Sequence, residues 1–389
     1  MSVGHFFSKS FDALNPLMVL CTLFCVCPSV YPKNGPSTII VRLYKIYGFF
    51  YCVISVVLAI VLLFLKDKLN QSIPYSVHVS DYFVHCALVA TCVTMITSLV
   101  LGRTKGLKLK KIFRLMQNID DKLGFDISVY KAKFYLGMLF YIALMVVYVV
   151  YDAFTWITFV GWDWYLLYLP KSIYICQLCL ALLLPMIVLK FTYLRVKKFN
   201  RTLRCLADVD LKTLHLQAKD MSHMHTTIYD IIIQFNKVFG AVCFVGTLMV
   251  VGLIVHYVLM LLVFFEFQSE LEGLKKKYVL AQCITGIILP FTLIIAIANT
   301  GDKVSYEAHK TTHICLKLLN NLPCRSNQDS VEAVREELKN LALQSSFRQP
   351  TISAKRFFPI NHTMLGSVIS SIVSYLIVTI QFLSRNENK

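Results

Sequence analysis

Seven long apolar runs constrain the fold of this chain more than any other feature of its sequence. They occupy residues 44–65, 77–101, 132–160, 165–190, 238–267, 278–298 and 360–383. Each run is long enough to cross a bilayer core of about 30 Å as a helix. Hydrophobic residues make up 57% of the chain and charged residues only 16%, which excludes an ordinary soluble domain. The sequence therefore predicts an all-α, polytopic membrane protein with seven transmembrane helices.

The distribution of basic residues sets the expected orientation. With the N-terminus inside, the inner segments hold about 31 of the 39 Lys and Arg residues, and the outer segments hold about 8. Cytosolic loops carry such an excess, so we expect a cytosolic N-terminus and an extracellular C-terminus. The net charge of +17 then faces anionic lipid and indicates no nucleic-acid partner. In this orientation Asn70 is the one sequon outside, and it is the predicted glycosylation site.

The long inner segments are predicted to be helical. The segment 107–123 carries a helical stripe of apolar residues, made of Leu109, Ile112, Phe113, Met116 and Ile119. The segment 194–235 is expected to continue the fourth span and to lead into the fifth, and 306–343 shows a similar apolar pattern. We expect these helices to form a bundle beneath the membrane. The apolar run 17–27 is too short to span, so it is expected to lie along the inner face.

The last apolar run differs from the others in its polar residues. Four serines follow helical spacing and share one face: Ser367, Ser370, Ser371 and Ser374. Serines let helices pack closely or bond back to their own carbonyl groups, which is one interpretation. The other is that this face lines a water path, because polar groups inside a membrane usually mark function.

The same run carries a motif near its end. Residues 374–382 read Ser-Tyr, five residues, then Gln381-Phe382, and upstream lie Leu343-Gln344, the segment 357–361 and Leu365. This pattern resembles the insect gustatory receptor family, whose members end in a Thr-Tyr pair, five apolar residues and Gln-Phe. Ser374 replaces the usual threonine here, and Thr379 places a hydroxyl inside the apolar run. The first six spans resemble the family in layout only.

The resemblance implies a ligand-gated, non-selective cation channel built from four subunits, with the last helix of each lining a central pore. By the motif, Gln381 and Phe382 are placed at the gate and Tyr375 against a neighbouring helix. The expected pore-lining residues are Ser367, Ser371, Ser374, Val378, Gln381 and Phe382. A ring of apolar side chains closes a pore by dewetting. The implied location is the plasma membrane, in dendrites of gustatory sensory neurons.

The expected organisation has four parts. Residues 1–43 form a cytosolic N-terminal segment, and 44–298 form a six-helix ligand-binding region with inner helical extensions. Residues 299–358 form cytosolic anchor helices, and 359–389 form the pore-lining helix with an extracellular tail. The expected partners are a small-molecule tastant, cations, membrane lipid and related receptor subunits in a homo- or heterotetramer. No metal or cofactor is expected.

Rings and polar groups gather near the predicted outer ends of five spans. The candidate ligand-binding residues are Asp81, Tyr82, His85, Tyr148, Tyr151, Asp152, Trp156, Tyr174, Gln177, His256, Tyr257 and Gln282. An aromatic belt at the membrane interface would explain some of the rings, and a buried Asp–His pair would explain some of the charges. A pocket for a small molecule is the other interpretation, because ionisable groups within a span usually face a cavity.

The ligand class follows in part from the motif. In the sweet-tasting subgroup of the family a glutamate often follows the motif tyrosine, and here that position is Leu376. A bitter or other non-volatile tastant is therefore favoured over a sugar. An odorant-receptor subunit is the nearest alternative. A G-protein-coupled receptor is less favoured because its N-terminus is outside. Neither a transporter's internal repeat nor an enzyme's catalytic motif is visible, so no enzymatic activity is expected.

Overall fold

The structure is a computed structural model that describes residues 9–27, 38–67, 75–100, 104–206, 211–266, 273–322, 329–348 and 350–387. In these ranges the chain is almost entirely helical. The elements are α1 (Lys9–Leu23), α2 (Thr38–Asp67), α3 (Tyr75–Leu99), α4 (Lys105–Leu123), α5 (Ser128–Val160), α6 (Trp162–Cys205), α7 (Leu211–Glu266), α8 (Gly273–Asn321), α9 (Asp329–Phe347), β1 (Ser353–Ala354), β2 (Phe358–Pro359) and α10 (His362–Glu387).

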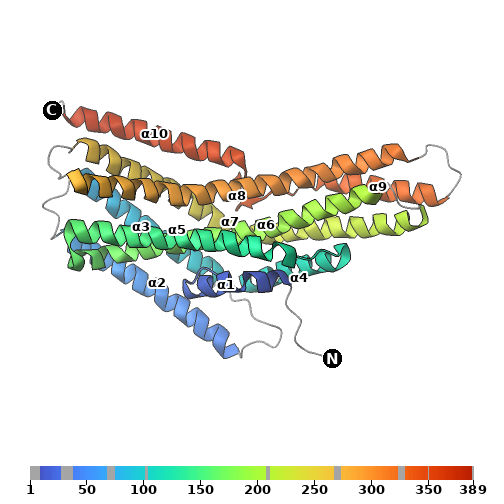
Figure 1. Cartoon of the computed structure of the whole chain (residues 1–389), viewed down its shortest axis with the longest axis horizontal. Coiled ribbons are helices and arrows are strands. Elements are labelled where there is room, and N and C mark those ends of the chain that lie inside the picture. The colour runs from blue at the N-terminus through green and yellow to red at the C-terminus, as the bar shows by residue number, and fades with distance from the viewer. Residues whose placement is uncertain are drawn as a thin grey trace.

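Three very long helices run the length of the molecule (Figure 1). α6, α7 and α8 contain 44, 56 and 49 residues. At 1.5 Å per residue they are roughly 65, 85 and 75 Å long, about twice the thickness of a bilayer core or more. Each must therefore extend beyond the membrane, as the sequence predicts for the inner segments. α6 and α8 remain helical through Pro185 and Pro290.

Within the described residues, five helices are long and apolar enough to span a membrane. The apolar stretches are Arg42–Val61, Ser128–Thr158, Leu169–Cys205, Leu216–Leu262 and Lys277–Asn321. The two remaining predicted spans contain shorter apolar stretches, Val84–Leu99 and His362–Val378, and the side chains next to them lie outside the described set. The seven predicted runs thus correspond to α2, α3, α5, α6, α7, α8 and α10.

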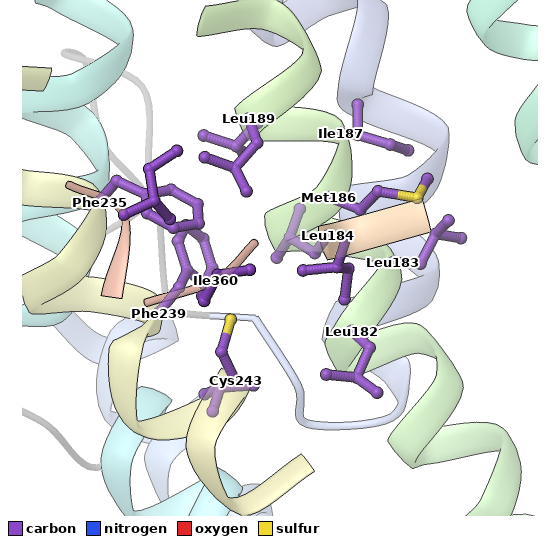
Figure 2. Close-up of a cluster of buried hydrophobic side chains, with 14 of the residues drawn as sticks. Leu182, Leu183, Leu184, Met186, Ile187, Leu189, Phe235, Phe239, Cys243 and Ile360 are labelled. Carbon is purple, nitrogen blue, oxygen red and sulfur yellow. The ribbon is translucent and has the colours of Figure 1, made fainter. Parts of the chain in front are cut away.

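The core is centred on α6, which is buried on all sides between Tyr174 and Leu189. A helix that is apolar all round needs neighbours on every face. Figure 2 shows Leu182, Leu184 and Leu189 of α6 facing the same packed region as Phe235 and Phe239 of α7. Ile360, at the start of the last predicted span, completes this cluster. The base of α10 is therefore fixed to the core.

The extensions of the long helices pack with α4 and α9. The five residues of the predicted α4 stripe are all buried, which confirms the stripe. Here α4 and α6 are joined by a buried ion pair, in which Arg195 Nη2 lies 2.5 Å from Asp120 Oδ2. Burial raises the pKa of Asp120, and the charge of Arg195 opposes that rise. Removing one partner of such a pair costs about 3–5 kcal/mol.

The N-terminal helix differs from the expectation that it lies along the inner face. Leu14, Leu17 and Cys21 of α1 are buried in the main core, and α1 packs against α4, α5 and α6. The Nε2 atom of Gln177 in α6 donates to the carbonyl oxygen of Phe24 at 3.1 Å. Because Gln177 lies well inside the predicted fourth span, the end of this segment is inserted between helices. Its buried apolar face explains the insertion.

A small hairpin joins α9, which packs on the extensions of the long helices, to α10. Strands β1 and β2 pair antiparallel, with Ala354 opposite Phe358. The side chain of Asn236 on α7 donates to the carbonyl oxygen of Thr351 at 2.8 Å and accepts from the backbone N–H of Ser353 at 3.0 Å. On the other side, Gly301 of α8 lies so close to Ile360 that a Cβ at this position would collide with its carbonyl oxygen. The hairpin is thus held by α7 and α8 together.

Candidate functional site

A buried polar cluster lies around Asp152, where α5, α6 and α8 meet. Asp152 is only 5% exposed. Its carboxylate accepts hydrogen bonds from Ser172 Oγ of α6, from Gln282 Nε2 of α8 and from the indole N–H of Trp156 on its own helix. A carboxylate inside a membrane protein is costly unless it is paired and hydrogen-bonded. These three donors, together with the nearby charge of Lys171, explain how it is accommodated.

The cluster continues onto α7. Lys171 Nζ of α6 lies 3.2 Å from His256 Nε2, and it also sits 5.8 Å from the centre of the Tyr257 ring. The hydroxyl of Tyr257 is hydrogen-bonded at 2.8 Å to the hydroxyl of Tyr148 on α5. One carboxylate, one lysine, one histidine and two phenols therefore converge from three helices. The site offers both donors and acceptors within an aromatic wall, which is the general character of a small-molecule pocket.

One hydrogen-bond acceptor in this cluster, on Gln282, is left for a ligand. Among the described residues, the amide oxygen of Gln282 is buried and has no hydrogen-bond partner, while its amide nitrogen is held by Asp152. A buried acceptor without a partner costs about 1–3 kcal/mol. A ligand carrying a hydroxyl or N–H group would remove that cost.

A second polar group on α6 lies against α2 and α3. The hydroxyl of Tyr174 donates to the carbonyl oxygen of Ser55 on α2 at 3.3 Å, and its ring meets His85 of α3 edge-on at 5.9 Å between centroids. Gln177, one turn along, accepts from Tyr51 of α2 at 3.4 Å. These side chains hold α1, α2, α3 and α6 together. They bond mainly to one another and to backbone, so this group is structural in character.

The structure therefore divides the predicted ligand-binding residues into two groups. Tyr148, Asp152, Trp156, His256, Tyr257 and Gln282 come together around Lys171, whereas His85, Tyr174 and Gln177 lie with the second group. Tyr151 is separate, because its hydroxyl donates to the backbone of Tyr278 at 3.3 Å. The side chains of Asp81 and Tyr82, and the whole of Asn70, lie outside the described residues.

Two residues of the Asp152 cluster were not predicted from the sequence, Lys171 and Ser172. Lys171 is 8% exposed and Ser172 is 1% exposed. A signal for Lys171 was present, since it is a charged residue inside the predicted fourth span. Its position near the end of that span makes it resemble an interface lysine. Ser172 carries no comparable signal, because serine is common in transmembrane helices.

The last helix, α10, lies at the edge of the molecule alongside α8 (Figure 1). It packs on α7, α8 and β2 through Met364, Val368 and Ile372, which are buried. The predicted polar face is exposed along its length, at Ser367, Ser370, Ser371, Ser374, Val378 and Gln381. The hydroxyls of Ser367 and Ser371 donate to the carbonyl oxygens four residues earlier, at 3.2 and 2.9 Å. The side chain of Phe382 lies outside the described set.

This architecture corresponds to a known family. The family model described as "7tm Chemosensory receptor" matches residues 14–385. The chain belongs to the 7tm chemosensory receptor family. The match covers nearly the whole receptor, including most of α1, so the family relationship inferred from the last helix extends over all seven spans.

Solved structures agree with this assignment at the level of the fold. The receptor is similar to the insect olfactory receptor OR5 from Machilis hrabei, with a TM-score of 0.64 and 12% sequence identity over 96% of this chain and 98% of that one. The structure of OR5 in complex with eugenol gives a TM-score of 0.63 and 11% identity over the same shares. No curated protein sequence matches this chain significantly. The predicted fold class is confirmed, because a family model of seven-span receptors matches residues 14–385 and an insect olfactory receptor shares the fold over 96% of this chain.

Proposed function

We propose that this protein is a gustatory receptor that acts as a ligand-gated, non-selective cation channel. It assembles as a homo- or heterotetramer in the plasma membrane of sensory neurons, with the N-terminus in the cytosol and the C-terminus outside. The observation that carries this proposal is the exposed polar face of α10. A helix inside a bilayer that presents serines and a glutamine away from its own subunit needs water or another protein surface on that side.

Four copies of α10 around an axis would give these residues a shared water path. Ser367, Ser371 and Ser374 would then line the inner part of the pore, with Val378, Gln381 and Phe382 towards its outer end. A ring of Phe382 closes the path by dewetting, and a ring of Gln381 offers amide oxygens to a passing cation. Serines that bond back to their own helix still present an oxygen to water.

The cluster around Asp152 is the proposed ligand site. It takes a small organic tastant with at least one donor group, which the open oxygen of Gln282 accepts. A bitter or other non-volatile compound is preferred over a sugar, because Leu376 follows the motif tyrosine. Binding favours the open state only by the difference in affinity between the open and closed states. Movement of α7 and α8 transmits the change, since α10 packs on those two helices.

A second candidate function is an odorant-receptor-type channel subunit. The similarity of fold to an olfactory receptor favours it, and that receptor has been seen with eugenol. The two candidates differ in ligand volatility, so a panel of volatile and non-volatile compounds tested on the same cells separates them. Responses to volatile compounds alone would favour the odorant type.

Recordings from cells that express the receptor test the pore assignment. We expect Phe382→Ala to raise basal cation current several-fold without ligand, and Gln381→Glu to increase relative permeability to divalent ions. Val373→Ala, on the side of α10 away from the serines, is the matched control and should leave both properties unchanged. Unchanged basal current in Phe382→Ala together with unchanged selectivity in Gln381→Glu would refute the assignment of α10 as the pore helix.

A further inference from the structure

Five basic side chains gather where α4, α7 and the hairpin meet. They are Lys105 and Lys108 at the start of α4, Lys237 on α7, and Lys355 and Arg356 in the hairpin turn. Lys237, Lys355 and Arg356 are exposed, and the two α4 lysines are partly buried. We call this set the junction patch. None of its members belongs to the proposed ligand site or to the pore.

Direct contacts bring these segments together. Lys105 Nζ donates to the carbonyl oxygens of Lys237 and, at 3.3 Å, of Val238, which ties the start of α4 to α7. One turn further along α7, a Cβ at Gly240 would lie 2.9 Å from the backbone nitrogen of Lys355, so the hairpin turn lies directly against the helix. Burial lowers the pKa of Lys105, and the nearby positive charges of Lys108 and Lys355 lower it further.

Among the described residues, the junction patch is a concentration of positive charge without a matching negative one. Within the described part of the chain, no ion pair joins any of the five to a carboxylate. A carboxylate at the same junction, Asp302 of α8, is directed to His362, with 3.4 Å between Nε2 and Oδ2. Like charges held together without a counter-charge repel one another, so an external anion stabilises the arrangement.

The position of the patch indicates where that anion comes from. Its members lie next to the predicted ends of three spans, at residues 101, 238 and 360, all on one side of the bilayer. That is the level of lipid headgroups. Two apolar side chains project beside the lysines: Leu107 is 70% exposed, and Phe357 is 68% exposed while its ring stacks on Phe244 at 4.5 Å. Basic residues flanked by exposed apolar ones are typical of a surface that contacts lipid.

The backbone of the hairpin turn sets the position of its two basic residues. Lys355 and Arg356 have φ values of 50° and 68°, in the left-handed region that favours glycine. Two consecutive residues with positive φ are what a type I′ hairpin turn requires, and the backbone N–H of Phe357 donates to the carbonyl oxygen of Ala354 at 3.0 Å to close that turn. The turn therefore places two cations side by side at its exposed end.

We propose that the junction patch binds the headgroup of an anionic phospholipid in the adjoining leaflet. The headgroup supplies the missing negative charge, and the acyl chains lie against Phe357 and Leu107. Because the hairpin continues directly into α10, a bound lipid also fixes the base of that helix. The site takes a membrane lipid and requires no tastant, so it stands independently of the ligand specificity of the receptor.

The test uses the purified full-length protein in a neutral detergent, with unfolding temperature as the measurement. Dioctanoyl phosphatidylserine is titrated into the wild type, and dioctanoyl phosphatidylcholine serves as the zwitterionic comparison. We expect the anionic lipid to raise the unfolding temperature saturably and phosphatidylcholine to have a much smaller effect. Lys355→Gln/Arg356→Gln should weaken the apparent affinity by roughly thirtyfold, because each basic residue near an anionic surface contributes about 1 kcal/mol.

The matched control is Lys317→Gln/Lys339→Gln, which removes the same charge from exposed positions on α8 and α9. It should keep the wild-type affinity. Equal weakening in both double variants would show diffuse charge attraction and overturn the proposal. Equal stabilisation by glycerophosphoserine, which has the headgroup without acyl chains, would indicate a site for a soluble anion and overturn it too. If phosphatidylserine did not stabilise the wild-type protein at all, the proposal would also be overturned.

Discussion

At the scale of single residues, Asp152 and Lys171 illustrate how charge is managed inside this receptor. The carboxylate is held by donors from two neighbouring side chains on α6 and α8, and the lysine lies against His256. The net worth of such buried charges is small, because desolvation offsets most of their attraction. Losing one of them is costly, since the other remains charged without compensation.

The high cost of leaving one buried charge without its partner leads to a prediction for Asp152→Asn. The substitution keeps the size of the side chain but removes the charge that compensates Lys171, and its amide nitrogen faces existing donors. We expect a loss of about 3 kcal/mol in the free energy of unfolding. Thermal unfolding of the purified receptor measures it. Asp302→Asn, at a half-exposed carboxylate, should cost less than about 1 kcal/mol.

A second substitution shows whether the two charges are coupled. Adding Lys171→Met to Asp152→Asn removes the uncompensated cation, so we expect the double variant to recover most of the lost stability. If the double variant were as unstable as the sum of both single variants, the two side chains would act independently, and the charge argument would fail.

At the scale of elements, the hairpin and α10 depend on one close helix–chain contact. Gly301 allows the backbone at Ile360 to approach α8, and Asn236 fixes the same segment to α7. Glycine inside a helix normally costs up to about 1 kcal/mol relative to alanine, so its presence here needs a packing reason. The approach of Ile360 provides that reason.

We therefore predict opposite effects for two glycine substitutions. Gly301→Ala should lower the unfolding temperature by several degrees, because its Cβ would collide with a backbone oxygen that cannot move freely. Gly137→Ala, in α5 with open space around it, should leave the temperature unchanged or raise it through better helix propensity. Thermal unfolding of both variants checks this. A stable Gly301→Ala would mean that the hairpin is not held tightly against α8.

At the scale of the whole molecule, the orientation in the membrane decides what each end of the bundle contacts. α3 packs against α6 and α7, and α5 packs against α6 and α8, while α4 packs on α6 and α7 and α9 packs on α7 and α8. In the proposed orientation, with the basic segments in the cytosol, the Asp152 cluster lies towards the outer side of the membrane and the junction patch towards the inner leaflet. The reversed orientation would exchange these environments.

Epitope tags test the orientation directly. We expect a tag after Lys389 to be stained on intact cells and a tag before Met1 only after permeabilisation. The doubly tagged protein provides the internal control, because each cell then reports both ends. The reverse pattern would contradict the orientation and remove the basis for an extracellular ligand site.

The sequence by itself determined the fold class, the seven spans, the helical stripe of α4 and the membership of the receptor family. These properties depend on run length, periodicity and a local motif, all of which are contained in neighbouring residues. The exposed serine face of α10 was predictable for the same reason, because one helix turn relates its members.

Only the tertiary structure decided which polar residues form one site. Asp152 and Gln282 are hydrogen-bonded although they are 130 positions apart in the sequence. Lys171 and Tyr174 are only three positions apart on α6, yet Lys171 contacts His256 of α7 and Tyr174 contacts Ser55 of α2. The insertion of α1 and the close approach at Gly301 were decided in the same way. The physical reason is that periodicity gives the faces of each helix, while the pairing of faces depends on the simultaneous packing of all the helices.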